Sequence, residues 1–110
     1  MSYDPGMVTI DDVRLKSKEL QERFDLSLFG VFGSVARNEA MPQSDVDIYV
    51  DFNRSRMPMI LDRYRGLTQT MEEMFGCSVQ LLTPRMVRNP VLKRSIERDL
   101  ILDRTGGDRA

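Results

Sequence analysis

The interpretation of this chain starts from the stretch Gly33–Asp51, which reads GSVARNEAMPQSDVDIYVD. From Asp45 onwards, apolar and polar residues alternate, which predicts a β-strand with one buried face and one polar face. The apolar face would hold Val46, Ile48, Val50 and Phe52, and the polar face Asp45, Asp47, Tyr49 and Asp51.

Asp45 and Asp47 are candidate metal ligands. Residues two apart on a strand point to the same side, so these two carboxylates should lie side by side. Their mutual repulsion is costly unless a cation lies between them. The chain contains no histidine, so oxygen atoms would hold the metal, and this favours Mg²⁺ or Mn²⁺. For an isolated pair of this kind, the alternative is an ordinary solvated strand face.

Gly33 and Ser34 form a second pair of candidate site residues. They follow the largely apolar run at residues 26–32 and precede a short helix expected over residues 35–39. A glycine lets the backbone approach a phosphate closely. The amide groups at a helix start and the Ser34 hydroxyl can donate hydrogen bonds to an anion. Taken alone, the pair is also compatible with an ordinary strand-to-helix turn.

Together the two segments resemble the signature of the DNA polymerase β nucleotidyltransferase superfamily, and most closely its minimal, MNT-type members. The match covers residues 29–50 closely. The resemblance implies that Gly33 and Ser34 bind a nucleoside triphosphate, with Arg37 and Ser44 as further nucleotide contacts. It also implies that Asp45 and Asp47 hold the metal. For Arg37, a surface ion pair is an equally good interpretation.

Two positions depart from the family pattern. Asn38 replaces a glycine, which is tolerable because asparagine adopts the left-handed conformation more readily than other residues do. Gln80, in the run VQLLTP at residues 79–84, replaces a third carboxylate. An amide cannot take a proton from an attacking hydroxyl. We therefore place Gln80 beside Asp45 and Asp47 as a candidate catalytic residue and expect weak or absent transfer activity.

The remaining pattern predicts an α/β fold, a small mixed sheet flanked by helices of the polymerase β-like kind. A single domain over residues 1–104 would precede a mobile polar tail at 105–110. A helix with a capping box at Thr9 and Asp12 should run to Phe24. The other expected elements are strands at 26–32, 45–52 and 78–82 and helices at 59–75 and 90–102. The last helix should turn Val91, Leu92, Ile96 and Leu100 inward.

Composition narrows the function classes. The net charge is −1, which argues against direct nucleic-acid binding. No apolar run is long enough for a membrane span, which needs about 18 residues. Residues 1–7 lack the pattern of a signal peptide, and the one cysteine, Cys77, allows no intrachain disulfide. These features lead us to expect a cytoplasmic protein.

Two functions remain open at this stage. The resemblance implies an enzyme that transfers a nucleoside monophosphate, AMP from ATP, to a hydroxyl on a partner protein. Minimal family members often pair with a helical HEPN protein as a toxin–antitoxin module, with the MNT chain as antitoxin. The alternative is a weakened nucleotide-binding or partner-binding module that sequesters a HEPN-like toxin. Because 110 residues leave no room for a separate acceptor domain, both functions require a partner chain or a homodimer. The arginines Arg85, Arg88, Arg94 and Arg98 are interpreted as a solvated face, with an acidic partner as the alternative.

Overall fold

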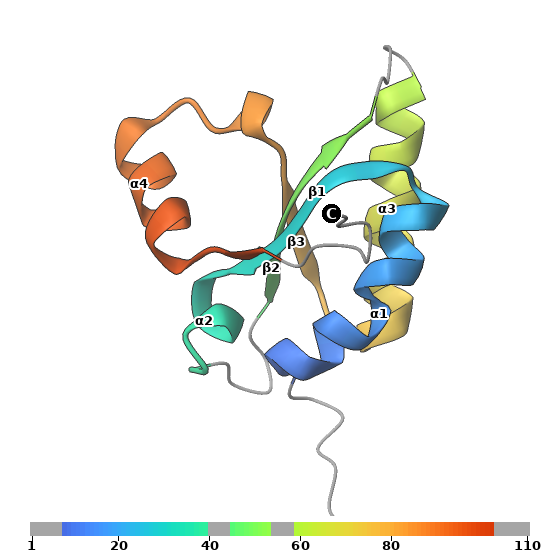
Figure 1. Cartoon of the computed structure of the whole chain (residues 1–110), viewed down its shortest axis with the longest axis horizontal. Helices are drawn as coiled ribbons and strands as arrows, with labels where there is room; N and C mark the ends of the chain where they lie inside the picture. The colour runs from blue at the N-terminus through green and yellow to red at the C-terminus, as the bar shows by residue number, and fades with distance from the viewer. Residues whose placement is uncertain (1–7, 40–44, 54–58, 103–110) are drawn as a thin grey trace, which may run out of the picture.

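The computed structural model describes residues 8–39, 45–53 and 59–102 and has a four-stranded sheet flanked by helices (Figure 1). The strand order is β3-β2-β1-β4; β1 pairs antiparallel with β2 and β4, and β2 pairs parallel with β3. The prediction of a small mixed α/β sheet is therefore confirmed. The strands are β1 (Leu26–Phe32), β2 (Val46–Phe52), β3 (Val79–Leu82) and β4 (Ile101–Leu102). The helices are α1 (Ile10–Arg23), α2 (Gly33–Ala36), α3 (Met59–Phe75), the 3₁₀ turn η1 (Pro84–Met86) and α4 (Pro90–Asp99).

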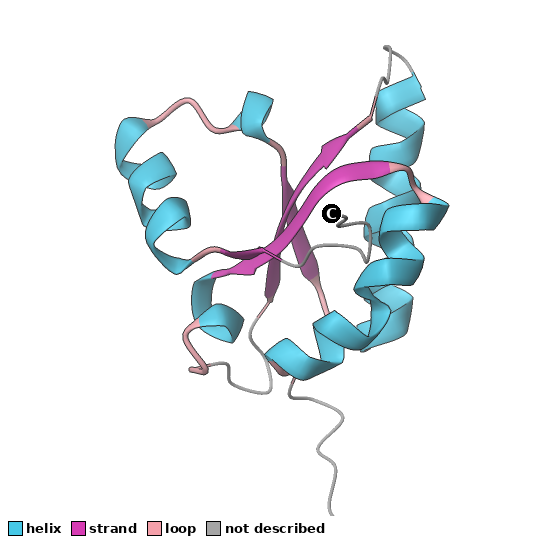
Figure 2. Cartoon of the chain, viewed as in Figure 1, coloured by secondary structure: helices cyan, strands magenta, loops and turns pink. Residues whose placement is uncertain are grey.

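Helices α1 and α3 lie together on one face of the sheet and build the main core there (Figure 2). Helix α1 begins as predicted, because the backbone N–H of Asp12 donates to Thr9 Oγ1 at 3.2 Å and that of Thr9 donates to Asp12 Oδ2 at 2.9 Å. Helix α3 ends at Gly76, whose φ of 69° is the left-handed conformation expected of a helix-ending glycine. The strand residues predicted to face inward, Val46, Ile48 and Val50, are buried in this core.

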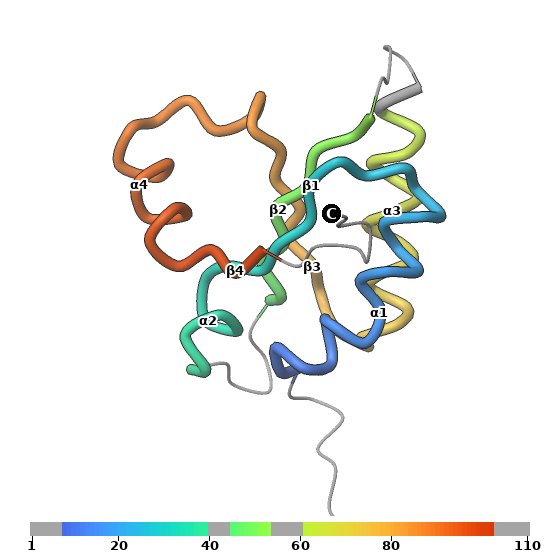
Figure 3. Tube along the Cα trace, in the orientation of Figure 1, coloured from blue at the N-terminus to red at the C-terminus, as the bar shows by residue number. Residues whose placement is uncertain are grey.

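The opposite face of the sheet is covered by η1 and α4, which the Cα trace shows on the far side of the sheet from α1 and α3 (Figure 3). The apolar cluster there is small. It consists of buried Phe32, Val87 and Ile96, with Tyr49, Leu82 and Leu100 packed against them. Most of the polar face of β2 lies on this side, so the candidate site shares its face with α4.

The predicted end of the last helix is wrong. Helix α4 stops at Asp99; Leu100 is extended, and Ile101 and Leu102 pair with Val31 and Gly30 of β1. Glycine at position 30 favours this approach, because a Cβ there would stand 2.7 Å from Leu100 Cδ1 and 3.0 Å from the Ile101 carbonyl oxygen. The strand forms because its backbone groups find partners on the open edge of β1.

The predicted inward face of α4 is also partly wrong. Ile96 is buried and Leu100 is half-buried, but Val91 and Leu92 are 73% and 41% exposed. Ile96 is the one buried residue of α4. The first turn of the helix is therefore exposed.

Smaller differences concern element bounds. The short helix occupies Gly33–Ala36 instead of residues 35–39, and β2 and β3 each begin one residue later than expected. No helix in the described ranges combines the length and apolar character needed to cross a membrane. The predicted mobile tail at residues 105–110 lies outside the described residues.

Candidate functional site

The centre of the candidate site is the contact between Asp47 and Gly33. Strands β1 and β2 pair Phe32 with Asp47, which places the start of α2 beside the Asp47 side chain. Gly33 has φ of 72°, and a Cβ at this position would overlap Asp47 Oδ2 and stand 2.9 Å from its Cγ. Position 33 therefore requires glycine twice over, once for the left-handed backbone and once for the closeness of the carboxylate.

Asp45 lies one residue before β2, and its charge acts on Asp47. Partial burial raises the pKa of Asp47 above its ordinary value, the nearby Asp45 carboxylate raises it further, and the charge of Arg37 opposes both. Two carboxylates that repel each other in a partly desolvated place are the chemistry that a divalent cation relieves. The predicted closeness of Asp47 to Gly33 is observed, and the sharing of a divalent ion by Asp45 and Asp47 stays a prediction.

Gln80 lies next to Asp47 in the sheet. The parallel pairing of β2 with β3 sets Asp47 opposite Gln80. Its neighbours Val79 and Leu81 are buried in the main core, whereas Gln80 is exposed. Gln80 therefore points to the same face as Asp47, as its position in the strand predicts.

Arg37 follows α2 and takes part in two ion pairs. Its Nε donates to Glu39 Oε1 at 3.0 Å and its Nη1 donates to Asp99 Oδ2 at 2.6 Å. Ion pairing was one of its two interpretations, and the other, a phosphate contact, is compatible with it because a guanidinium has five donors. Asn38 has φ of 60°, so its expected left-handed conformation is confirmed.

Of the two serines predicted to contact the nucleotide, the structure describes only Ser34. Ser34 is half-buried in the first turn of α2, and its carbonyl accepts from the backbone N–H of Glu39 at 2.8 Å. Ser44, the other predicted nucleotide contact, lies outside the described residues.

Asp99 is the site residue that sequence reasoning missed. Its side chain is only 8% exposed, and it contacts Arg37 from the far end of the chain. A carboxylate in the last turn of a helix is disfavoured by the helix dipole. That local conflict was the one signal in the sequence that could have pointed to a tertiary partner for Asp99.

The donor set fits a hard divalent ion better than zinc. Asp45 and Asp47 offer carboxylate oxygens and Gln80 an amide oxygen, which suits Mg²⁺ or Mn²⁺. Within residues 8–39, 45–53 and 59–102, no group of three or more histidine, cysteine, aspartate or glutamate side chains is arranged to hold a metal. Two protein carboxylates are nevertheless a usual complement for magnesium when substrate phosphates supply further oxygens.

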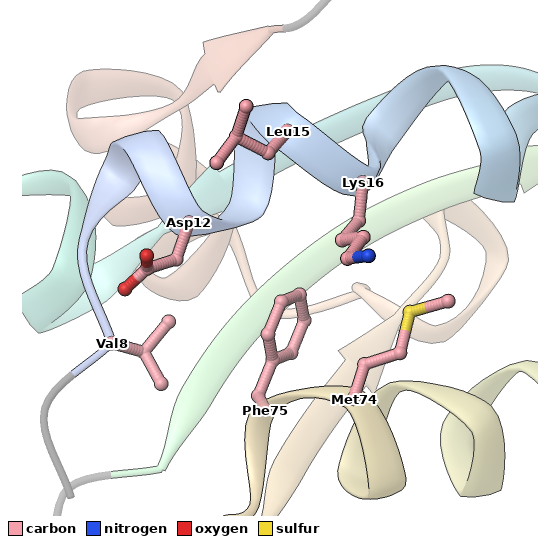
Figure 4. A pocket seen from close by; sticks show the side chains of 6 residues that line it. All are labelled: Val8, Asp12, Leu15, Lys16, Met74 and Phe75. Atoms are coloured by element: carbon pink, nitrogen blue, oxygen red, sulfur yellow. The ribbon is translucent and has the colours of Figure 1, made fainter. Parts of the chain in front are cut away.

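A hollow of about 140 Å³ lies elsewhere, between the start of α1 and the end of α3 (Figure 4). Val8 and Phe75 from the main core, with Leu15, Lys16, Met74 and Asp12, line it. None of these residues belongs to the carboxylate site.

Comparison with known proteins gives this geometry its context. The nucleotidyltransferase domain family matches residues 13–103, a range that includes Gly33, Asp45, Asp47 and Gln80. The chain belongs to the nucleotidyltransferase domain family. The prediction from the two sequence motifs is thus confirmed at the level of family and fold.

Relatives and solved structures agree with the assignment. A candidate protein adenylyltransferase of Methanocaldococcus jannaschii is 36% identical over 89 residues, which cover 81% of this chain and 88% of that protein. The protein adenylyltransferase MntA of Thermococcus cleftensis is 35% identical over 92 residues, covering 80% of this chain and 90% of its own length. A structure described as a candidate minimal nucleotidyltransferase superposes with a TM-score of 0.69 at 28% identity, covering 86% of this chain and 95% of the other. A toxin–antitoxin crystal structure with AMP-PNP shares the fold, with a TM-score of 0.64 at 21% identity over 81% of this chain and 70% of the other.

Proposed function

We propose that this nucleotidyltransferase transfers AMP from ATP to a hydroxyl group of a partner protein. The observation that carries the proposal is the packing of the Asp47 carboxylate against Gly33, with Asp45 close enough to act on it electrostatically. This arrangement brings a turn suited to phosphate and a carboxylate pair suited to metal into direct contact. The names of the relatives support the choice of AMP and of a protein acceptor.

Each site residue has a role in this proposal. Asp45 and Asp47 would hold Mg²⁺ or Mn²⁺, and Gly33, Ser34, Ser44 and Arg37 would bind the triphosphate. A bound divalent ion would neutralise phosphate charge and orient the reacting groups. The chain itself would then contribute by positioning the triphosphate in line with the acceptor hydroxyl, with little covalent work.

A protein acceptor is supported by the surface next to the site. η1 and α4 cover the same face of the sheet that carries Asp47, and they expose Met86, Val91 and Leu92 at 50%, 73% and 41%. Exposed apolar side chains of this kind, flanked by arginines, are typical of a surface that contacts another protein. The partner in the proposal is a helical HEPN-like toxin, and a second copy of the chain is the other arrangement to test.

Label transfer from ATP tests the proposal directly. The chain is incubated with Mg²⁺, ATP labelled in the α-phosphate and a small helical HEPN-like protein from the same genome. We expect label on the partner, lost when EDTA is added and lost in the double variant Asp45→Asn/Asp47→Asn. Folding of that variant is checked by circular dichroism. Equal labelling by the variant and the wild type would contradict the proposed metal site.

A second function is favoured by one observation, the position of Gln80 beside Asp47. If Gln80 stands where the family has its proton-accepting carboxylate, the chain would bind nucleotide and partner but turn over slowly or not at all. It would then act by sequestering the toxin. Tight partner binding without label transfer, in the presence of metal-dependent ATP binding, would identify this function.

A further inference from the structure

The ion pair between Arg37 and Asp99 joins the proposed nucleotide site to the end of α4. The two residues are 62 positions apart, and Arg37 Nη1 donates to Asp99 Oδ2 at 2.6 Å. The Asp99 side chain is 8% exposed, whereas that of Arg37 is 43% exposed. A charge-assisted hydrogen bond to a buried carboxylate restrains a side chain far more than a solvated surface pair does.

Asp99 is itself held in place by the backbone that follows it. Leu100 packs against Phe32, Val87 and Ile96, and Ile101 pairs with Val31 of β1. Strand β1 runs directly into Gly33, where α2 begins. The carboxylate of Asp99 is therefore fixed relative to the turn that carries Gly33 and Ser34.

The ion pairs leave part of the Arg37 guanidinium available. Glu39, which is 65% exposed, accepts from Nε, and Asp99 accepts from Nη1. The second terminal nitrogen of Arg37, Nη2, has no hydrogen-bond partner among the residues that the structure describes. A free arginine side chain loses rotamer entropy when it is ordered. A guanidinium that is already ordered by two carboxylates avoids much of that cost when a phosphate binds.

We propose that Asp99 is a positioning residue that holds the Arg37 guanidinium ready to contact the β- and γ-phosphates of the bound nucleotide. The inference rests on the proposed function, since it requires nucleoside triphosphate at Gly33 and Ser34. It adds a residue from the far end of the chain to the nucleotide site. It also gives the pairing of β4 with β1 a functional consequence, because that pairing sets the position of Asp99.

Affinities for ATP and AMP in the presence of Mg²⁺, measured by calorimetry on the full chain, test the inference. Asp99→Asn should weaken ATP binding about 3- to 10-fold and leave AMP binding unchanged, because AMP lacks the phosphates that Arg37 would contact. Arg37→Ala should cause a similar or larger loss for ATP. In the double variant Arg37→Ala/Asp99→Asn, the second change should add nothing, since Asp99 acts through Arg37.

Two further variants separate positioning from a structural effect. Arg98→Gln removes the other ion pair of Asp99, at 3.4 Å from a 72% exposed side chain, and should leave ATP affinity at the wild-type value. Asp99→Glu keeps the charge but displaces the guanidinium, and should give an ATP affinity between those of the wild type and Asp99→Asn. If Asp99→Asn does not fold, Asp99→Glu decides by the same comparison of ATP with AMP.

The outcomes that overturn the inference are distinct from failure of the proposed function. A folded Asp99→Asn variant with wild-type ATP affinity overturns it, and so does an equal loss for ATP and AMP. Losses that simply add in the double variant also overturn it, because Asp99 would then act independently of Arg37. If the wild type binds no ATP with Mg²⁺, the proposed function itself fails, and the inference fails with it.

Discussion

At the scale of single residues, Gly33 and Gly76 form a natural pair of test positions. Both have positive φ, at 72° and 69°. A Cβ at Gly33 would collide with Asp47, whereas a Cβ at Gly76 would meet nothing within 4 Å. The two positions therefore separate the cost of backbone strain from the cost of disturbing the site.

We predict that Gly33→Ala abolishes Mg²⁺-dependent ATP binding while Gly76→Ala preserves it. Both should lose stability, by about 1–2 kcal/mol for the left-handed backbone alone, and Gly33→Ala should lose more. Calorimetry with ATP and thermal denaturation check the two parts. Wild-type ATP affinity in Gly33→Ala would mean that the contact with Asp47 does not shape the site.

Asp47 predicts a pH dependence of the protein's stability. Burial and Asp45 raise its pKa in the folded state, so protonation favours folding. The stabilisation that the protonated Asp47 side chain contributes is fully present below the ordinary aspartate pKa of about 3.9. It is lost as the pH rises through the raised pKa of the folded state. In metal-free buffer, Asp47→Asn should therefore melt a few degrees higher than the wild type at pH 7. The difference should shrink towards pH 4.

The matched control for this variant is Asp51→Asn, an exposed carboxylate near the other end of β2. It should show no such gain at pH 7. If Asp47→Asn melts below the wild type in metal-free buffer, Asp47 stabilises the fold through contacts of its own. Its assignment as a strained ligand would then be wrong.

Gln80 is the position where chemistry can be restored. If it replaces a proton-accepting carboxylate, Gln80→Asp should raise the rate of AMP transfer to the partner, by up to about 10²–10⁴-fold. Gln80→Glu serves as a control for the length of the side chain that carries the carboxylate. The measurement is label transfer from ATP at saturating Mg²⁺. Fast transfer by the wild type that does not change in Gln80→Asp would show that another group accepts the proton.

At the scale of elements, α4 is held by few contacts. Ile96→Ala should destabilise the protein by about 2 kcal/mol or more, because it empties the centre of the small cluster with Phe32 and Val87. Val91→Ala, on the exposed first turn of the same helix, should change stability by less than about 0.5 kcal/mol. Urea denaturation of both variants checks the difference. An equal loss at both positions would contradict the observed burial.

Local patterns predicted the elements on the main core face and failed at the C-terminal end. The capping box at Thr9, the alternation in β2 and the helix-ending Gly76 are short-range signals, and all three are confirmed. The switch from helix to strand after Asp99 depends on the open edge of β1, about 70 residues earlier in the chain. No window around Leu100 contains that information.

At the scale of the whole molecule, ligand binding should raise the free energy of unfolding. A ligand that binds only the folded state at 100 times its Kd adds about 2.7 kcal/mol. We therefore expect ATP with Mg²⁺ to raise the melting temperature by several degrees, and EDTA to remove the effect. The Asp45→Asn/Asp47→Asn variant should show no shift. An equal shift with and without Mg²⁺ would argue against a metal between protein and triphosphate.

The candidate site was predictable where neighbours in sequence are neighbours in space. The alternation of the two strands predicted a common face for Asp47 and Gln80, and the register between β2 and β3 agrees with it. The contact of Gly33 with Asp47 depends on the register between β1 and β2, and the Arg37–Asp99 pair depends on the course of α4. Such long-range contacts leave no periodic signal in the sequence.

The pairing of β4 with β1 also has a consequence for biosynthesis. A ribosome releases residues 33–47 well before residues 99–102, so a nascent chain can bring Gly33 against Asp47 while Arg37 still lacks Asp99. The outer edge of β1 at Gly30 and Val31 stays uncovered for the same interval. The segment at residues 99–102 thus both pairs with the open edge of β1 and supplies the carboxylate that contacts Arg37. The ion pair between Arg37 and Asp99 can therefore form only after residue 99 has been released.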